Sequence, residues 1–434
     1  MKPVNFAAVG DICLSNNCGK QIELEGPDWP FANVAHVFSQ ADLLFGNMES
    51  VVLPHSYPED FIDKQGLVSK FDGTEALQRA GFSFMNMASN HILDGGEVGM
   101  FHTRDVLETR GIATGGIGRD QEEARGISVL AGGEMRFGFL CYCKDSNYSL
   151  GTTGPCHAYY HPDIVLEDIS RHRGDVDVLV VSVHADQEHV ETPSPVRRKE
   201  FHRFAEAGAT LVLGHHPHVP QGIELINNRL IAYSLGNFYF YPHTMPWHKN
   251  KRPHTAESFV LIASTMPGRV ESFRRIPVTI PIPPEMRPTP CVGTEAKRLL
   301  NYFSLLDQMC QDESLISKNW RARALHNVES RLHSLYEDQR AATGWQHKLL
   351  RLVERSLRVN GRPDLDLDTV FERALIPLLL TPDNREWMEE IRMEAVRRWE
   401  ALSEMEDIYH RPSYRLSNKD QNAKNAGGKK KSDQ

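Results

Sequence analysis

Long hydrophobic segments are missing from this 434-residue sequence. No run approaches the roughly 20 apolar residues that a membrane-spanning helix requires. The first residues, Met1 to Phe6, lead directly into an apolar strand without the hydrophobic core of a secretory signal peptide. We therefore expect a cytoplasmic protein.

An excess of positive charge and a set of paired cysteines are also missing. Lys and Arg total 49 against 57 Asp and Glu, and the formal net charge of -8 carries no global signature of nucleic-acid binding. The seven cysteines are odd in number and form no Cys-x-x-Cys pair, which favours a reducing compartment over a disulfide framework. We therefore expect no nucleic-acid partner.

The sequence does contain a regular alternation of strands and helices. Short apolar runs predict buried strands at 6–9, 41–45, 82–87, 178–183, 211–213 and 231–234. Helical patterns separate them at 31–40, 74–80, 100–109 and 195–207. This rhythm is typical of a layered α/β fold.

The pattern changes after residue 281. We predict a domain over 1–281, a proline-rich linker over 282–294 and a helical domain over 295–416, in which Leu325, Val328, Leu332 and Leu335 recur at helical spacing. Residues 417–434 lack an apolar anchor and are expected to form a disordered tail.

Most of the predicted strands end in residues that suit a divalent cation. The carboxyl ends of strands are where open α/β sheets place their sites. A mixture of carboxylates, an amide oxygen and imidazoles fits one or two ions of Mn, Fe or Zn, and two adjacent ions can polarise a phosphoester and activate a water. The expected metal ligands are Asp11, Glu49, Asn90, His184, His216 and His218. His91 is the expected general acid that protonates the leaving group.

Simpler readings exist for several of these residues. An Asp after a strand is often a turn former or a helix cap. Asp94 either orients the region around His91 or caps the next helix. Glu188 is expected to shape a loop rather than to bind metal. Cys13 is expected to fill a tight loop, although a thiolate there could bind zinc.

Taken together, the motifs resemble the CapA family of capsule or poly-γ-glutamate synthesis proteins, within the calcineurin-like metallophosphoesterase superfamily. The resemblance runs over residues 4–281 and rests on Gly10-Asp11, Asn47-Met48-Glu49, Ser89-Asn90-His91-Ile92-Leu93-Asp94, His184 with Glu188, Gly214-His215-His216-Pro217-His218 and Ser234-Leu235-Gly236-Asn237-Phe238. It implies a four-layer sandwich of two mixed β-sheets flanked by helices. It also implies the metal ligands and the acid named above, with His215 as an additional histidine.

Two positions depart from the superfamily pattern. Its first motif is Asp-x-His, whereas Cys13 stands at the His position here, and its second motif has an Asp where this chain has Glu49. These departures imply that one ion is weakly held or that only one ion binds. The residues expected to orient ligands or contact substrate are Asn47, Asp94, Glu188, His215 and Asn237.

We therefore expect a CapA-like metal-dependent phosphoester hydrolase associated with the synthesis of a surface polymer, either poly-γ-glutamate or polysaccharide. Its substrate would be a small molecule or polymer precursor, and membrane polymer-synthesis machinery is a possible partner. The alternative is a non-catalytic, metal-binding assembly component of a polymer synthesis or export complex.

Overall fold

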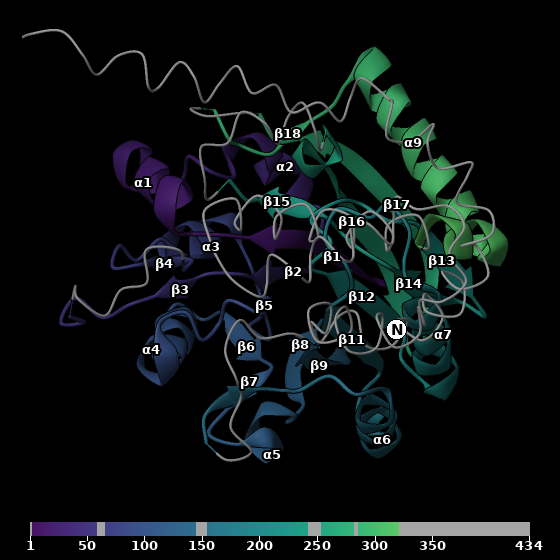
Figure 1. Ribbon diagram of the computed structural model, residues 1–434, viewed down its shortest axis with the longest axis horizontal. Coiled ribbons are helices and arrows are strands. Elements are labelled where there is room, and N and C mark those ends of the chain that lie inside the picture. The colour runs from purple at the N-terminus through teal and green to yellow at the C-terminus, as the bar shows by residue number, and fades with distance from the viewer. Residues whose placement is uncertain (1, 59–65, 145–153, 242–252, 282–284, 321–434) are drawn as a thin grey trace, which may run out of the picture. The chain divides into compact units, whose positions relative to one another are not determined.

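A computed structural model describes residues 2–58, 66–144, 154–241, 253–281 and 285–320 (Figure 1). Its first compact unit spans Met1–Arg323. The predicted repeats from Leu325 to Leu335, the rest of the predicted helical domain and the predicted tail lie outside the described residues.

The first sheet is mixed, because a parallel half adjoins an antiparallel half. The parallel strands are β1 (Val4–Ile12), β2 (Leu43–Met48), β5 (Phe84–Asn86), β6 (Ala113–Gly115) and the short β15 (Asn237–Tyr239), which pairs with β1. The antiparallel strands are β16 (Glu257–Met266), β17 (Arg269–Thr279) and β18 (Thr289–Pro290).

The second sheet is also mixed, with the order β13-β14-β12-β11-β9-β8. Its parallel centre consists of β9 (Met135–Cys143), β11 (Val178–His184), β12 (Leu211–His215) and β14 (Arg229–Ala232). The antiparallel edges are β8 (Ser128–Gly132) and β13 (Ile223–Ile226). Two small sheets pair β3 (Val51–Val52) with β4 (Val68–Ser69) and β7 (Ile117–Gly118) with β10 (Cys156–His157).

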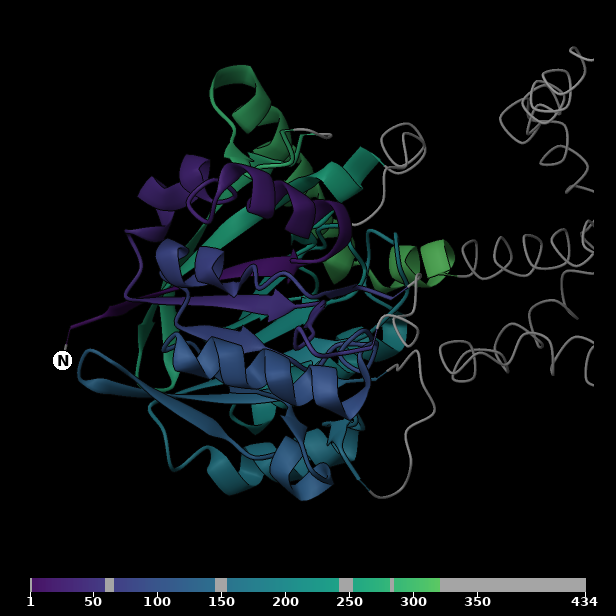
Figure 2. The same ribbon diagram turned by 90° about the vertical axis from the view of Figure 1, so that its left-hand side faces the viewer.

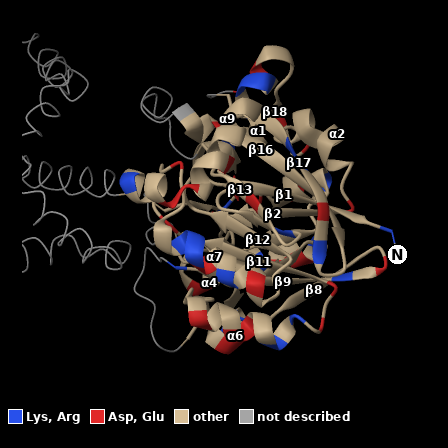
Figure 3. Ribbon diagram, turned by 90° about the vertical axis from the view of Figure 1, so that its right-hand side faces the viewer, with Lys and Arg blue, Asp and Glu red and all other residues tan. Residues whose placement is uncertain are grey.

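Helices cover the outer face of each sheet. The first sheet carries α1 (Asn16–Glu25), η1 (Ala32–Val34), α2 (Ala35–Phe38), α3 (Thr74–Ala80) and α4 (Gly96–Thr109), seen in purple and blue in Figure 2. The second carries α5 (Gln121–Ala124), α6 (Pro162–His172) and α7 (Pro195–Ala207). In Figure 3 the charged residues lie on helices such as α6 and α7, whereas the strands are mostly uncharged.

Three separate hydrophobic cores establish the four layers. Along β1, Phe6 and Ala8 belong to the core between the two sheets, whereas Ala7 and Val9 belong to the core under the helices. This follows from the alternation of side chains along a strand. Between the sheets, the rings of Phe84 and Phe139 stack with their centroids 4.1 Å apart. The predicted fold, two mixed sheets flanked by helices, is confirmed.

Several local predictions change. The first strand does not end before Asp11 but continues to Ile12, because β15 pairs alongside and the Asp11 amide donates to the Gly236 carbonyl. The helix expected over 31–40 is shorter, consisting of η1 and α2.

The predicted boundary at residue 281 also differs, because the compact unit extends beyond it. Helix α9 (Gly293–Gln311), which begins within the predicted linker, places Leu299, Phe303 and Leu306 in the core between the sheets. Its Asp307 pairs with Arg275 of β17 at 2.5 Å. A short helix, η3 (Pro253–Ala256), precedes β16, and residues 313–320 are also helical. None of the described helices is both long and apolar enough to cross a membrane.

Candidate metal centre

The carboxyl ends of parallel strands from both sheets meet at one place. In the first sheet, Asp11 of β1 pairs in register with Asn47 of β2, and Glu49 lies two residues beyond Asn47. In the second sheet, His184 of β11 pairs in register with His215 of β12, and His216 and His218 follow. Strand direction and register therefore bring together residues that are up to 207 positions apart in the sequence.

Two glycines allow the backbone to run close enough for this. Gly10 directly precedes Asp11, and a Cβ atom there would overlap the carbonyl of Gly236. Gly214 precedes His215, and a Cβ atom there would overlap the carbonyl of Tyr233. Only glycine fits at such close approaches of two backbones.

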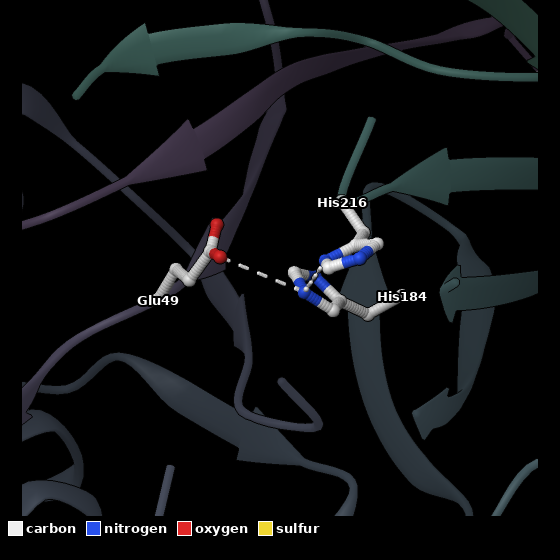
Figure 4. Close-up of side chains that lie close together, drawn as sticks. All are labelled: Glu49, His184 and His216. Atoms are coloured by element: carbon white, nitrogen blue, oxygen red, sulfur yellow. Dashed lines mark hydrogen bonds and ion pairs between the residues drawn. The ribbon is translucent and has the colours of Figure 1, made fainter. Parts of the chain in front are cut away.

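The clustered side chains form three groups that could each hold a cation. The potential ligand atoms within each group lie within 4.8 Å of one another. The groups are Asp11 with Glu49 and His218, Glu49 with His184 and His216, and Glu188 with His216 and His218. Glu49 is common to the first two groups, so its carboxylate is placed to bridge two ions. Figure 4 shows Glu49 pointing toward His184 and His216 from the opposite side.

Glu49 has the surroundings of a carboxylate that needs a cation. Its side chain is fully buried, and neither carboxylate oxygen has a hydrogen-bond partner. The nearest basic atoms are the Nε2 atoms of His218 and His184, at 3.5 and 3.7 Å from Oε1. Burial raises the pKa of Glu49 well above its usual range, and the nearby His218 only partly opposes this. A buried charge of this kind is stabilised by a metal ion or by an ion pair, so the residues present fit a divalent cation.

The other charges in the cluster are set by neighbouring groups. Burial would raise the pKa of Asp11, but the imidazoles of His215 and His218, whose Nδ1 atoms lie 3.5 and 3.2 Å from its carboxylate oxygens, outweigh it and hold the pKa well below the usual range. Burial would lower the pKa of His218, but Glu49 and Asp11 outweigh it and raise the pKa to about 10. Burial and the neighbouring His216 lower the pKa of His184 well below its usual value. His184 is therefore neutral, which is the form of imidazole that binds metals.

Amide side chains hold these ligands in place. The Oδ1 atom of Asn90 lies 3.0 Å from Nε2 of His184, and Oδ1 of Asn237 lies 2.9 Å from Nδ1 of His218. Asn47 links the two sheets, since its Nδ2 donates to Oδ1 of Asp11 at 2.9 Å and lies 3.2 Å from Nδ1 of His184. Asn86 in turn donates to Asn47 at 2.7 Å. The sequence reasoning missed Asn86, although its place at the end of β5 was a signal of the same kind.

His91 lies beside this cluster rather than within it. Its neighbour in sequence, Asn90, contacts His184, but His91 belongs to none of the three ligand groups formed by the described residues. Its Nδ1 lies 2.8 Å from Oδ2 of Asp94, and its side chain is 21% exposed. Asp94 also accepts from the Leu67 amide at 2.6 Å, whereas the N-cap of α4 is Gly95. Asp94 therefore orients His91 and does not cap the helix.

Three further residues can now be placed. The thiol of Cys13 is buried in the core beneath the helices, 3.3 Å from the Ser15 hydroxyl, and Cys13 belongs to no ligand group of the described residues. This placement agrees with the expectation that Cys13 fills a tight loop. His215 is fully buried, with Nδ1 3.5 Å from Oδ1 of Asp11. Glu188 was expected to shape a loop, orient ligands or contact substrate rather than to bind metal, and its carboxylate lies within 4.8 Å of ligand atoms of His216 and His218.

Comparisons with known proteins agree with the sequence resemblance. The family model described as "Bacterial capsule synthesis protein PGA_cap" matches residues 5–242. The capsule biosynthesis protein CapA of Bacillus anthracis is 27% identical over 289 residues, covering 64% of this chain and 70% of the relative. The PGA biosynthesis protein CapA of Bacillus subtilis (strain 168) is 30% identical over 244 residues, covering 54% of this chain and 62% of the relative. The match therefore leaves about a third of each relative's length uncovered.

One solved structure, from Staphylococcus aureus in complex with alpha-ketoglutarate, is also similar. It is 14% identical, covers 70% of this chain and 58% of its own, and has a TM-score of 0.41. A TM-score at this level assigns neither a fold nor a function.

Proposed function

The chain belongs to the bacterial capsule synthesis protein family, and from this membership we propose that it is a metal-dependent hydrolase of phosphoesters. The observation that supports this is the placement of Glu49 in two ligand groups at once. A carboxylate shared by two cation sites is the arrangement that two-metal phosphoester hydrolysis uses.

The side chains divide the work between binding and proton transfer. Asp11, Glu49, Asn90, His184, His216 and His218 hold one or two ions of Mn, Fe or Zn, as their mixed oxygen and nitrogen atoms suggest. When bound, such ions polarise the phosphoryl group and lower the pKa of a coordinated water. Asp94 holds the His91 ring through Nδ1, which orients His91 for the role of protonating the leaving oxygen.

The names of the relatives point to the biological setting. Both Bacillus proteins are named for the synthesis of a capsule or of PGA. We propose by extension that the phosphoester belongs to a precursor of a surface polymer, and that the protein works with membrane polymer-synthesis machinery.

Metal analysis combined with a hydrolysis assay tests the proposal. We expect the purified chain to contain Mn, Fe or Zn and to hydrolyse bis-p-nitrophenyl phosphate, and we expect His216→Ala and Asp11→Asn to abolish this activity. A matched control is His172→Ala, a histidine on α6 next to Asp175 and outside the cluster, which should leave metal content and hydrolysis unchanged. Metal-loaded wild-type protein that is inactive on a broad panel of phosphoesters would argue against catalysis.

A second candidate function rests on Cys13. The superfamily's His ligand is absent, and the thiol in its place lies in the core beneath the helices. A cluster that binds metal without turnover would suit an assembly component of a polymer synthesis complex. Co-purification with membrane polymer-synthesis proteins that survives His91→Ala, together with inactivity on phosphoesters, would favour this alternative.

A further inference from the structure

The loop after β11, residues 185–194, brings a carboxylate to the histidines from the side of the second sheet. In this loop Glu188 forms a potential cation-binding group with His216 and His218. We propose that Glu188 is a metal ligand that takes the place of the histidine missing at position 13. The proposal rests on the metal-binding function proposed above and concerns only how the weaker ion is held.

Position 13 leaves one ligand group short of donors. The superfamily pattern adds a histidine at position 13 to the Asp11–Glu49–His218 group. Without that histidine the group keeps three residues, the smallest number of protein ligands that a catalytic metal commonly has. Cys13 does not add to this group, because its thiol is buried beside Ser15 and Cys18. Glu188 has a carboxylate oxygen within 4.8 Å of a ring nitrogen of His218, which is a member of this group, and from this shared histidine we infer that Glu188 supplements the group.

The loop is fixed on the side of the histidines. The His189 amide donates to the carbonyl of Pro217, between His216 and His218, at 2.8 Å. The side chain of Gln221 donates to the carbonyl of Val190 at 2.7 Å. Both bonds tie the residues that follow Glu188 to the turn that carries the two histidines.

The loop is also fixed at its other end. Asp186 accepts from the Ser194 amide at 2.8 Å, which closes the loop upon itself. From the C-terminal part of the described chain, Tyr302 of α9 donates to Glu191 at 2.9 Å and the Trp320 indole donates to the Thr192 carbonyl at 3.1 Å. Asp186 and His189 have positive φ angles of 94° and 62°. Positive φ angles are uncommon for non-glycine residues, and the hydrogen bonds on both sides of Glu188 hold the loop in this conformation.

Exposure distinguishes Glu188 from the other carboxylates of the cluster. Its side chain is 45% exposed, whereas those of Asp11 and Glu49 are fully buried. A half-exposed carboxylate costs less to leave without a cation than a buried one. Glu188 is therefore the ligand that an incoming phosphoester can displace most easily, while Asp11, Glu49 and His218 keep their hold.

Manganese titration of the full-length chain tests the proposal without relying on activity. Wild type, Glu188→Gln and Glu191→Gln are stripped with EDTA and titrated with Mn²⁺, and binding is followed by calorimetry and by the electron paramagnetic resonance signal of free Mn²⁺. Glu191→Gln is a matched control, since it makes the same change three residues along the same loop, where the carboxylate contacts His254 and Tyr302 instead. Circular dichroism of the stripped proteins establishes that all three are folded.

We expect Glu188→Gln to weaken the weakest Mn²⁺-binding step by at least about tenfold, with Glu191→Gln close to wild type. Titration curves of Glu188→Gln that superimpose on wild type would overturn the inference while leaving the metal site intact. An equal loss in both variants would overturn it as well, because the loop would then act by position and not by ligation. Absence of Mn²⁺ binding in wild type would instead overturn the proposed function itself.

Discussion

The two sheets contribute different chemistry to the same site. The first sheet supplies oxygen atoms, from Asp11 on β1, Glu49 after β2 and Asn90 after β5. The second sheet supplies nitrogen atoms, from His184 on β11 and from His216 and His218 after β12, and the loop after β11 adds the carboxylate of Glu188 at the rim. Every ligand group of the described residues contains an oxygen and a nitrogen ligand, and the two groups that contain Glu49 take these from different sheets.

This division makes the site a product of tertiary packing. Neither sheet alone assembles a group of mixed ligands around Glu49, so the core between the sheets sets the distances between carboxylates and imidazoles. Asn47 adds a polar link between the sheets, because it contacts Asp11 of one sheet and His184 of the other. The following predictions separate the contributions of the two sheets, beginning with the largest effect.

Removing the charge of Glu49 should have the largest effect. Glu49→Gln removes the carboxylate from both of the groups that contain Glu49, so we expect loss of hydrolysis and loss of the metal-dependent rise in Tm. A ligand at one hundred times its Kd stabilises a protein by about 2.7 kcal/mol, and this increment should vanish. Thermal unfolding with and without Mn²⁺ measures it. A metal-dependent rise in Tm that persists in Glu49→Gln would disprove the bridging role.

His91 is the test of whether every imidazole at the site binds metal. It follows the first sheet, lies outside the three ligand groups and is held by Asp94. We expect His91→Ala to lower kcat by about 10²–10⁴-fold, the usual contribution of general acid–base catalysis, with unchanged metal content. His216→Ala, from the second sheet, should instead lose metal. If His91→Ala lost metal as well, the first sheet would also supply a nitrogen ligand, and the division of oxygen and nitrogen ligands between the sheets would not hold.

Truncation of the core between the sheets should act on stability and on binding together. Phe84 of β5 stacks on Phe139 of β9 and is fully buried. Phe84→Ala should lower the free energy of unfolding by about 3–5 kcal/mol, the usual cost for a buried aromatic. Urea unfolding measures this loss, and Mn²⁺ titration at low temperature should detect weaker binding. Leu305→Ala, on an exposed position of α9 at 51% exposure, serves as the control and should change neither.

The sequence predicted which residues follow the buried strands, because an apolar run and the polar residues after it are local features of the sequence. Each buried apolar run ended near a polar residue, and parallel strands place their carboxyl ends at one edge. The continuation of β1 through Asp11 was not predicted, because it depends on pairing with β15. In this pairing Asp11 lies opposite Asn237, which is 226 residues later in the sequence. For the same reason, the sequence did not predict Glu188 as a metal ligand. Its reach to His218 depends on contacts of residues 186–194 with the His216–His218 turn, α9 and Trp320.

The smallest expected effect concerns how the loop of the second sheet is held by residues from the first sheet and α9. His254 of η3 lies 3.0 Å from Glu191 of the loop and 2.6 Å from Glu257, which also pairs with Arg298 of α9. Its ring stacks on Tyr302, with centroids 4.4 Å apart. Hydrogen bonds to Glu191 and Glu257 raise the pKa of His254 to about 9, although partial burial opposes the shift.

The sign of the pH dependence follows from the direction of this shift. Because the folded state binds the proton more tightly than the unfolded state, the contribution of His254 to stability is complete below pH 6.5 and is lost as the pH rises through 9. We expect a difference of about 1 kcal/mol, since the pair is partly exposed. The Tm of wild type minus that of His254→Gln should therefore fall between pH 6.5 and pH 9.5. A difference that stays constant over this range would show that His254 supports the loop by packing on Tyr302 and not by charge.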